Sequence, residues 1–287
     1  MHRQILQLDH VQFAGATHEP AVTLAEGLLE RAGMRDQAKV FYSDNGSTAV
    51  EVALKIAHQH WGNQGESRPL FAVLQGAYHG DTAGAMSVGR SSGFFGKFEG
   101  LMSGTIPLPV PLVWQSHDEE EETVRALAAA RTLLDQREKE IAGLIVEPLV
   151  QGAGGMRFHS ARFLRDLSGL FRERSIPVIF DEVMTGFGRT GSFFAFQQTG
   201  ITPDLICLSK GITGGILPLA ATIASNVLFS SFLGGDFSTA LAHGHSYTAN
   251  PVACAAGLAS LELHRVSDSA AQVRRIHDRM AEGMARI

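Results

Sequence analysis

Short apolar runs alternate with longer helical patterns along this chain, which limits the folds open to it. The apolar runs cover Ala38–Ser43, Leu70–Gln75, Gly143–Glu147, Pro177–Phe180, Leu205–Ser209 and Ala220–Ala224. The helical patterns cover Thr48–Trp61, Glu119–Glu140, Ser160–Arg174 and Pro251–Arg265. This order is typical of a mostly parallel sheet with helices on both faces. We therefore predict an α/β fold in which functional residues gather where strands end.

The stretch from Val178 to Gly211 places two reactive side chains at the ends of successive buried strands. One apolar run ends in Asp181, and the next delivers Lys210. A lysine at such a position can form an imine with an aldehyde once partial burial leaves free amine to attack. Pyridoxal phosphate is the commonest such aldehyde, and its pyridine nitrogen usually pairs with an aspartate. Taken singly, Lys210 also fits a solvated loop residue and Asp181 a turn residue.

Composition and charge indicate which partners to expect. The 287 residues are 45% hydrophobic and 18% charged, as in an ordinary globular chain, and the net charge of −5 provides no basic field for nucleic acid or anionic membranes. We expect small-molecule partners, no nucleic acid and no membrane. Cys207 and Cys254 lie in apolar surroundings and fit reduced core residues. The segment from Met1 lacks the apolar core of a signal peptide, so the expected compartment is cytoplasmic.

Two further strand ends carry polar residues suited to a phosphate and a flat ring. Gly46 and Ser47 follow the first strand and open a helix, whose N-terminal N–H groups favour a phosphate. Taken alone, these residues fit an ordinary helix cap better than a phosphate site. Tyr78 and His79 follow the second strand between glycines, and a tyrosine there can stack on an aromatic ligand.

Glu147 ends the third strand, where it can bond a cofactor oxygen, hold an arginine, or simply face water. The histidines and acids near residues 79 and 243 lack the third ligand and the spacing of a zinc site, so no metal is expected. Gly152–Gly155 does not spell a dinucleotide fingerprint, and no Walker pattern is present. The turn that contains Ser246 offers hydroxyls to a phosphate or caps the following helix. The segment Ser91–Val113 has no clear periodicity and fits a long loop or an interface segment.

Five motifs in order resemble the class-III aminotransferases, which are pyridoxal-phosphate enzymes of fold type I. They are Gly46-Ser47-Thr48, Tyr78-His79-Gly80-Asp81-Thr82, Ile145-Val146-Glu147-Pro148, Phe180-Asp181-Glu182-Val183 with Thr185–Gly191, and Ser209-Lys210-Gly211. Together they span most of the chain. Within the family, Thr17-His18-Glu19-Pro20, Gly84–Ser87 and His243–Thr248 resemble the biotin-pathway branch, which aminates 8-amino-7-oxononanoate to 7,8-diaminononanoate.

The resemblance implies a role for each matching residue. Lys210 would bind the cofactor covalently, Asp181 would pair with the pyridine nitrogen, and Val183 would pack on the ring face opposite Tyr78. The other cofactor contacts would come from Gly46, Ser47, His79, Glu147 and Ser246, with Ser246 supplied by the partner subunit of a homodimer. Tyr78, Lys210 and Gly244 would contact the substrate. Arg189 lies in the turn after Asp181. The implied reaction is a ping-pong transfer with S-adenosylmethionine or lysine as amino donor.

The resemblance also implies a division of the chain. Residues 1–265 would form the large cofactor-binding domain without its N-terminal segment, and residues 266–287 a helix leading towards an absent C-terminal small domain. Substrate-binding aromatic residues and a carboxylate-binding arginine of the family would then lie outside this sequence. Two alternatives stay open: another ω-aminotransferase, aminomutase or decarboxylase of the same fold, and a catalytically silent remnant.

Overall fold

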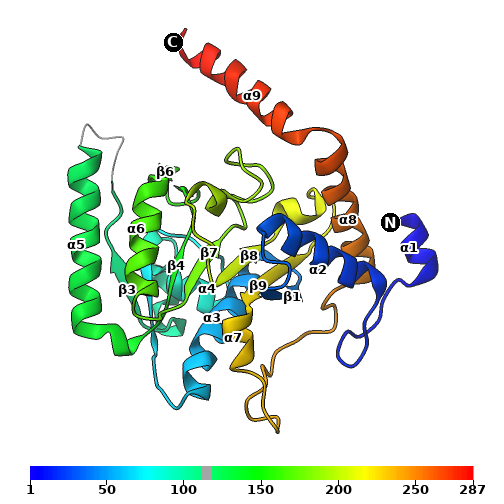
Figure 1. Cartoon of the computed structure of the whole chain (residues 1–287), viewed down its shortest axis with the longest axis horizontal. Coiled ribbons are helices and arrows are strands. Elements are labelled where there is room, and N and C mark those ends of the chain that lie inside the picture. Colours follow the sequence, from blue (N-terminus) through cyan, green and yellow to red (C-terminus); the bar gives the residue numbers. More distant parts are fainter. Residues whose placement is uncertain (112–117, 287) are drawn as a thin grey trace.

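The computed structural model describes residues 1–111 and 118–286 (Figure 1). Its strands are β1 (Ala38–Ser43), β2 (Leu70–Leu74), β3 (Thr105–Leu108), β4 (Ile141–Val146), β5 (Val150–Gln151), β6 (Arg157–Phe158), β7 (Val178–Asp181), β8 (Leu205–Leu208) and β9 (Ala220–Ser225). Its α-helices are α1 (His2–Gln7), α2 (Glu19–Ala32), α3 (Gly46–Asn63), α4 (Ala83–Val88), α5 (Glu119–Arg137), α6 (Ala161–Arg172), α7 (Asn226–Ser230), α8 (Pro251–Val266) and α9 (Ser269–Met284).

The main sheet has the strand order β1-β9-β8-β7-β4-β2-β3, and β5 and β6 form a separate small sheet. Strands β8, β7, β4, β2 and β3 run parallel, whereas β9 is antiparallel to both of its neighbours. The prediction of a mostly parallel α/β sheet is therefore confirmed. All six predicted strands are present.

Each face of the sheet packs against its own set of helices (Figure 1). Along β7, Val178 and Phe180 join the core under α2, α5, α6 and α8, while Ile179 between them joins the core under α3 and α4. Successive side chains of a strand point to opposite faces, so a strand buried on both faces must be apolar throughout. The apolar runs of β4, β8 and the first three residues of β7 satisfy this requirement, and the one charged residue, Asp181, lies at the end of β7.

The parallel arrangement brings several distant segments to one edge of the sheet. The chain leaves the carboxyl ends of β2, β4, β7 and β8 just before Tyr78, Glu147, Val183 and Lys210, respectively. The helix α3 begins directly after β1, where Asn45 and Thr48 form a reciprocal capping box. Ligands of open α/β sheets bind at this edge.

The sequence analysis missed the longer helix α2, the short helices α1, α4 and α7, and the short strands β3, β5 and β6, and one prediction needs adjustment. Helix α2 was not predicted, and strand β3 lies inside the Ser91–Val113 segment, whose last two residues fall outside the described ranges. The polar helix predicted beyond Arg265 starts anew as α9, because Asp268 adopts a left-handed backbone with φ of 42° that separates it from α8. Its predicted end at Ile287 also lies outside the described residues.

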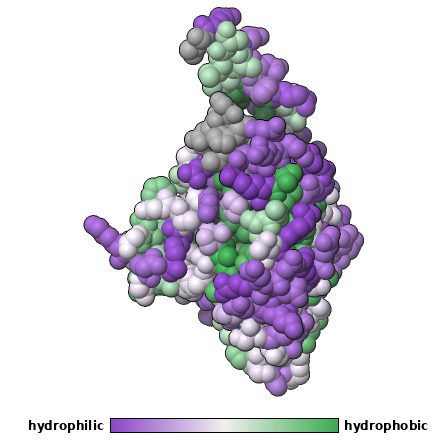
Figure 2. All heavy atoms as spheres, turned by 90° about the vertical axis from the view of Figure 1, so that its left-hand side faces the viewer, coloured by the Kyte–Doolittle hydropathy of each residue, from purple (hydrophilic) through white to green (hydrophobic). Residues whose placement is uncertain are grey.

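Helix α9 stands out from the body of the molecule at the top of Figures 1 and 2, where it presents both hydrophilic and apolar residues. None of its residues is buried. No helix in the described part of the chain is long and apolar enough to cross a membrane.

Candidate active site

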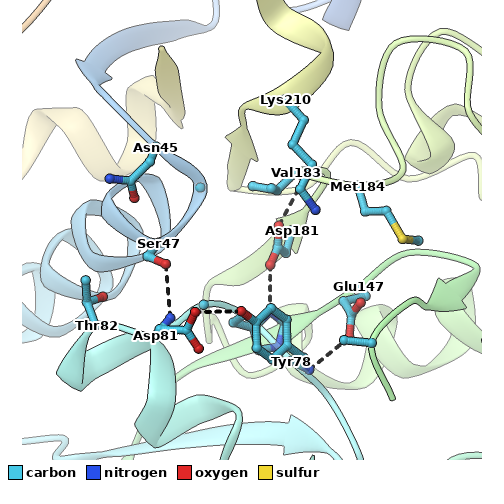
Figure 3. Close-up of a pocket in the computed structure, with 14 residues that line it drawn as sticks. Asn45, Ser47, Tyr78, Asp81, Thr82, Glu147, Asp181, Val183, Met184 and Lys210 are labelled. Carbon is cyan, nitrogen blue, oxygen red and sulfur yellow. Dashed lines mark hydrogen bonds and ion pairs between the residues drawn. The ribbon is translucent and has the colours of Figure 1, made fainter. Parts of the chain in front are cut away.

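A hollow of about 460 Å³ lies at the carboxyl edge of the main sheet. This volume falls in the range of small-molecule sites. Eight residues singled out from the sequence line it: Gly46, Ser47, Tyr78, His79, Glu147, Asp181, Val183 and Lys210. In the view of Figure 3, Asn45 and Ser47 lie on one side of the hollow, Glu147 and Met184 on the other, and Asp181 between them.

The N-terminus of α3 forms one wall of the hollow. The first-turn N–H groups of a helix have no partner within the helix, and the helix dipole favours an anion there. Asn45 accepts a hydrogen bond from the Thr48 N–H at 3.0 Å, and the next two residues, Gly46 and Ser47, line the hollow. A Cβ at Gly46 would lie 2.7 Å from Val183 Cγ1, so only glycine allows this close approach.

Asp181 and His79 form a buried pair beneath the hollow. Asp181 Oδ2 lies 2.7 Å from His79 Nδ1, and Asp181 Oδ1 accepts the Val183 N–H at 3.0 Å. Both residues are buried, with exposures of 4% and 3%. Because a carboxylate only accepts hydrogen bonds, Nδ1 is the donor. The Nε2 atom of His79 is buried without a partner among the described residues.

Glu147 is held by hydrogen bonds from the backbone. Its Oε1 accepts the Tyr78 N–H at 3.0 Å, and its Oε2 accepts the Gly152 N–H at 2.9 Å. Burial raises the pKa of this carboxyl, an effect opposed by the nearby His79 and the two N–H groups. Glu147 therefore ties two loops of the pocket together and does not face open water.

Tyr78 is supported from behind by an aromatic side chain. Its ring stacks on the buried Phe95 at a centroid distance of 6.0 Å and an interplanar angle of 21°, and Phe94 meets its edge. The Tyr78 hydroxyl donates to Asp81 Oδ2 at 3.0 Å. Burial, followed by this hydrogen bond to Asp81, raises the pKa of the phenol. The ring is thus fixed at the hollow while its other face stays available.

Lys210 lies at the mouth of the hollow, at the start of a short 3₁₀ helix that runs from Lys210 to Thr213. Its backbone is left-handed, with φ of 44°. The side chain is exposed, which differs from the expectation of partial burial. The reason is its position one residue beyond the buried Ser209, where the strand has ended and the chain turns outward.

Two predicted residues lie outside this hollow in the single chain. Gly244 and Ser246 line a second hollow of about 540 Å³ together with His10 and His243. Arg189 is exposed in the turn after Asp181 and does not line the first hollow.

Several lining residues were not predicted as site residues from the sequence: Asn45, Gly80, Asp81, Thr82, Ala153 and Met184. Three of them directly adjoin a predicted residue, and Asp81 and Thr82 belong to the same motif as Tyr78 and His79, so proximity along the chain was the available signal. Ala153 belongs to the glycine loop after β4, whose fold back onto the pocket depends on the Glu147–Gly152 bond.

The residues fit pyridoxal phosphate on two observations. Glycines make room at the expected phosphate end: a Cβ at Gly80 would overlap the Ser47 side chain, as one at Gly46 would press on Val183. A buried carboxylate, Asp181, supplies the negative charge that a protonated pyridine nitrogen requires, and Lys210 supplies an amine at the same hollow. Among the described residues, no group of three or more His, Cys, Asp or Glu side chains could hold a metal ion.

Comparison with known proteins gives consistent matches. A family model described as aminotransferase class-III matches residues 1–287. The adenosylmethionine-8-amino-7-oxononanoate aminotransferase of Synechococcus elongatus is 49% identical over 282 residues, which is 98% of this chain and 66% of that protein.

Solved structures of similar proteins agree. The crystal structure of adenosylmethionine-8-amino-7-oxononanoate aminotransferase from Methanocaldococcus jannaschii has a TM-score of 0.85 and 34% identity, covering 94% of this chain and 61% of that one. A PLP-bound amine transaminase from an uncultivated Pseudomonas species has a TM-score of 0.84 and 35% identity, covering 93% and 62%. The chain thus spans less than two thirds of the length of these relatives.

Proposed function

Because the chain belongs to the class-III aminotransferase family, whose cofactor is pyridoxal 5'-phosphate, we propose that it takes part in amino transfer to 8-amino-7-oxononanoate in biotin biosynthesis. The product would be 7,8-diaminononanoate. The observation that supports this most strongly is the meeting of Lys210, the Asp181–His79 pair and the N-terminus of α3 at one hollow. The names of the relatives favour S-adenosylmethionine as amino donor, with lysine as the alternative.

Each residue of the hollow has a task in this proposal. Bound pyridoxal phosphate supplies an aldehyde that takes up amines and a ring that draws electrons from the reacting carbon. The Lys210 amine would hold the cofactor, then take a proton from the donor carbon and return it on the acceptor side. Asp181 would keep a proton on the pyridine nitrogen, because its buried carboxylate faces that charge.

The remaining contacts would position the ring. Gly46 and Ser47 would donate backbone N–H groups to the phosphate. Tyr78 and Val183 would cover the two ring faces, and Glu147 would stay as a brace between the loops that carry Tyr78 and Gly152. His79 would act through Asp181, since its Nδ1 bonds that carboxylate.

We extend the proposal to a homodimer with shared sites. Gly244 and Ser246 lie outside the first hollow in one chain, so they would serve the site of the partner subunit, Ser246 at the phosphate and Gly244 at the substrate. Residues 1–265 would be the cofactor-binding domain, and residues 266–287 would lead towards a small domain. The cytoplasmic compartment stays a prediction from the sequence.

Visible absorbance tests the proposal directly. Titration of the chain with pyridoxal phosphate is expected to give a visible band that is lost in Lys210→Ala, because Lys210 is the one lysine that lines the hollow among the described residues. Lys139→Ala serves as the control, since Lys139 is exposed and lines neither this hollow nor the one that contains Ser246. S-adenosylmethionine and lysine are then added separately, and the compound that bleaches the band is the amino donor.

Two outcomes separate the competing functions. A band that bleaches with other ω-amino donors but yields no product from 8-amino-7-oxononanoate would favour another class-III aminotransferase or aminomutase. Absence of any Lys210-dependent band would favour a catalytically silent module.

A further inference from the structure

Glu182 is a fully buried carboxylate that the proposed chemistry does not use. It follows Asp181 at the end of β7 and has an exposure of 0%. Its side chain accepts three hydrogen bonds: Oε2 from the Thr185 hydroxyl at 2.6 Å and the Ala195 N–H at 3.0 Å, and Oε1 from the Phe196 N–H at 2.7 Å. These donors are all uncharged. Burial raises the pKa of Glu182 to about 7, although the three donors oppose the shift.

These bonds join the two ends of one loop, defined here as the 183–196 loop. Thr185 lies two residues into it, while Ala195 and Phe196 lie at its end. The Glu182 carbonyl also accepts the Gly186 N–H at 2.9 Å. Glu182 therefore holds both the first residues and the last residues of the loop. A buried carboxylate holds its donors in place, because water cannot replace a hydrogen bond that is lost and an unpaired buried charge is costly.

The first residues of the loop form part of the cofactor hollow. Val183 and Met184 line it, and Val183 is in close contact with the N-terminus of α3 at Gly46. Glu182 immediately precedes them. Glu182 itself does not line the hollow, and neither do its three partners Thr185, Ala195 and Phe196.

The middle of the loop reaches the residue after Lys210. Phe187 adopts a left-handed backbone with φ of 58°, and its Cβ lies 2.8 Å from the position that a Cβ on Gly211 would occupy. The same ring packs on the buried Phe194 at 5.7 Å. Phe187 thus packs between Phe194, near the end of the loop, and Gly211, in the 3₁₀ helix that begins at Lys210.

We infer that Glu182 is a positioning residue for the cofactor site: its carboxylate clamps the 183–196 loop so that Val183 stays at the hollow and Phe187 stays against Gly211. The assignment of Lys210 as the cofactor-binding amine rests on the proposed function. The clamp itself rests on the bonds to Thr185, Ala195 and Phe196.

Glu182→Gln tests this inference, since it keeps the side-chain size but replaces one acceptor oxygen with an NH₂ group facing other donors. Glu122→Gln is the matched control: Glu122 is also a buried carboxylate, with 7% exposure, and it pairs with Arg125 on α5, away from the hollow. We expect at least about tenfold faster amide exchange at Ala195 and Phe196 and an about tenfold weaker pyridoxal-phosphate titration in Glu182→Gln only.

A spectroscopic readout separates positioning from plain stability. The pH midpoint of the Lys210-dependent band should move in Glu182→Gln and stay in place in Glu122→Gln. Faster exchange without any change in the titration or the pH midpoint would overturn the inference, because Glu182 would then serve stability alone. Equal effects in both variants would overturn it too.

Two further measurements keep the test decisive. If Glu182→Gln does not fold, Thr185→Val removes a single donor, and unchanged exchange at Ala195 and Phe196 in that variant would contradict the clamp. If the unaltered chain shows no Lys210-dependent band, the proposed function fails. The exchange measurement then still tests the clamp.

Discussion

At the scale of single residues, His159 shows the cost of burying a titratable group without a partner. It is 4% exposed, and both ring nitrogens lack hydrogen-bond partners among the described residues. Its ring meets Phe163 edge-on at 5.9 Å. Burial lowers the pKa of His159 to about 4, because the imidazolium would be desolvated.

His159→Phe should remove this pH dependence. A base whose folded-state pKa is depressed adds stability above its unfolded pKa near 6.5, and this stability is lost as the pH falls through 4. The free energy of unfolding of the unaltered chain, relative to His159→Phe, should therefore fall by about 3 kcal/mol between pH 7 and pH 4. Denaturant unfolding at several pH values measures this. Parallel pH profiles for the two chains would contradict the prediction, and His277→Phe on exposed α9 is the control.

Sequence reasoning at this scale found residues whose position is set by strand ends. Asp181 and Lys210 follow apolar runs, so the parallel sheet alone brings them to one edge. It missed Glu182 and His159 as buried groups, because the polarity of a side chain says nothing about which way it points once its strand has ended. Their environments depend on Thr185, Ala195 and Phe163, which arrive through tertiary folding.

At the scale of secondary structure, α9 is a long helix of 16 residues with no buried residue. Val273, Ile276, Met280 and Met284 recur every three or four residues and so share one face, yet none is buried. Ile276 is 61% exposed and Met280 65%. Most helical stability in proteins comes from packing such an apolar face against other elements. Within residues 1–111 and 118–286, the apolar face of α9 has no such packing.

Amide hydrogen exchange should reveal this difference. The amides of α9 are expected to exchange within the dead time of a manual experiment, whereas those of α8, which buries seven residues including Cys254 and Leu261, should be protected much longer. Equal protection in the two helices would show that the apolar face of α9 is covered in solution.

Elements with regular patterns were predictable, and those that depend on context were not. Helix α2 begins with the cap residue His18, whose ring nitrogen accepts the Ala21 N–H in a role usually taken by Ser, Thr, Asp or Asn. Strand β3 is a four-residue edge strand that contains Pro107, which strand patterns disfavour.

At the scale of the whole molecule, residues proposed for one cofactor site lie in two separate hollows of the single chain. Lys210 lines the first hollow, and Ser246 lines the second. In the proposed dimer each site would combine Lys210 of one subunit with Ser246 of the other. If one subunit lacks Lys210 and the other lacks Ser246, both changes then fall in the same site of the mixed dimer, and the second site stays intact.

Subunit mixing tests this arrangement. Lys210→Ala and Ser246→Asp should each abolish the pyridoxal-phosphate band, the second because a carboxylate repels the phosphate. When the two chains are unfolded, mixed equally and refolded, about a quarter of the sites should recover the band, since each mixed dimer holds one intact site. Ser238→Asp, on an exposed loop, is the control. Failure to recover any band after mixing would contradict a shared site.

The pairing of β1 with β9 also sets the order in which this chain can fold during synthesis. Ala38 pairs with Ser225 and Ser43 with Ala220, and β9 is the one strand paired with β1. At typical ribosomal speeds, β1 waits on the order of ten seconds or more before its hydrogen-bonding partner is made. The N-terminus of α3 follows β1 directly, so this wall of the hollow is completed only when nearly the whole sheet has emerged from the ribosome.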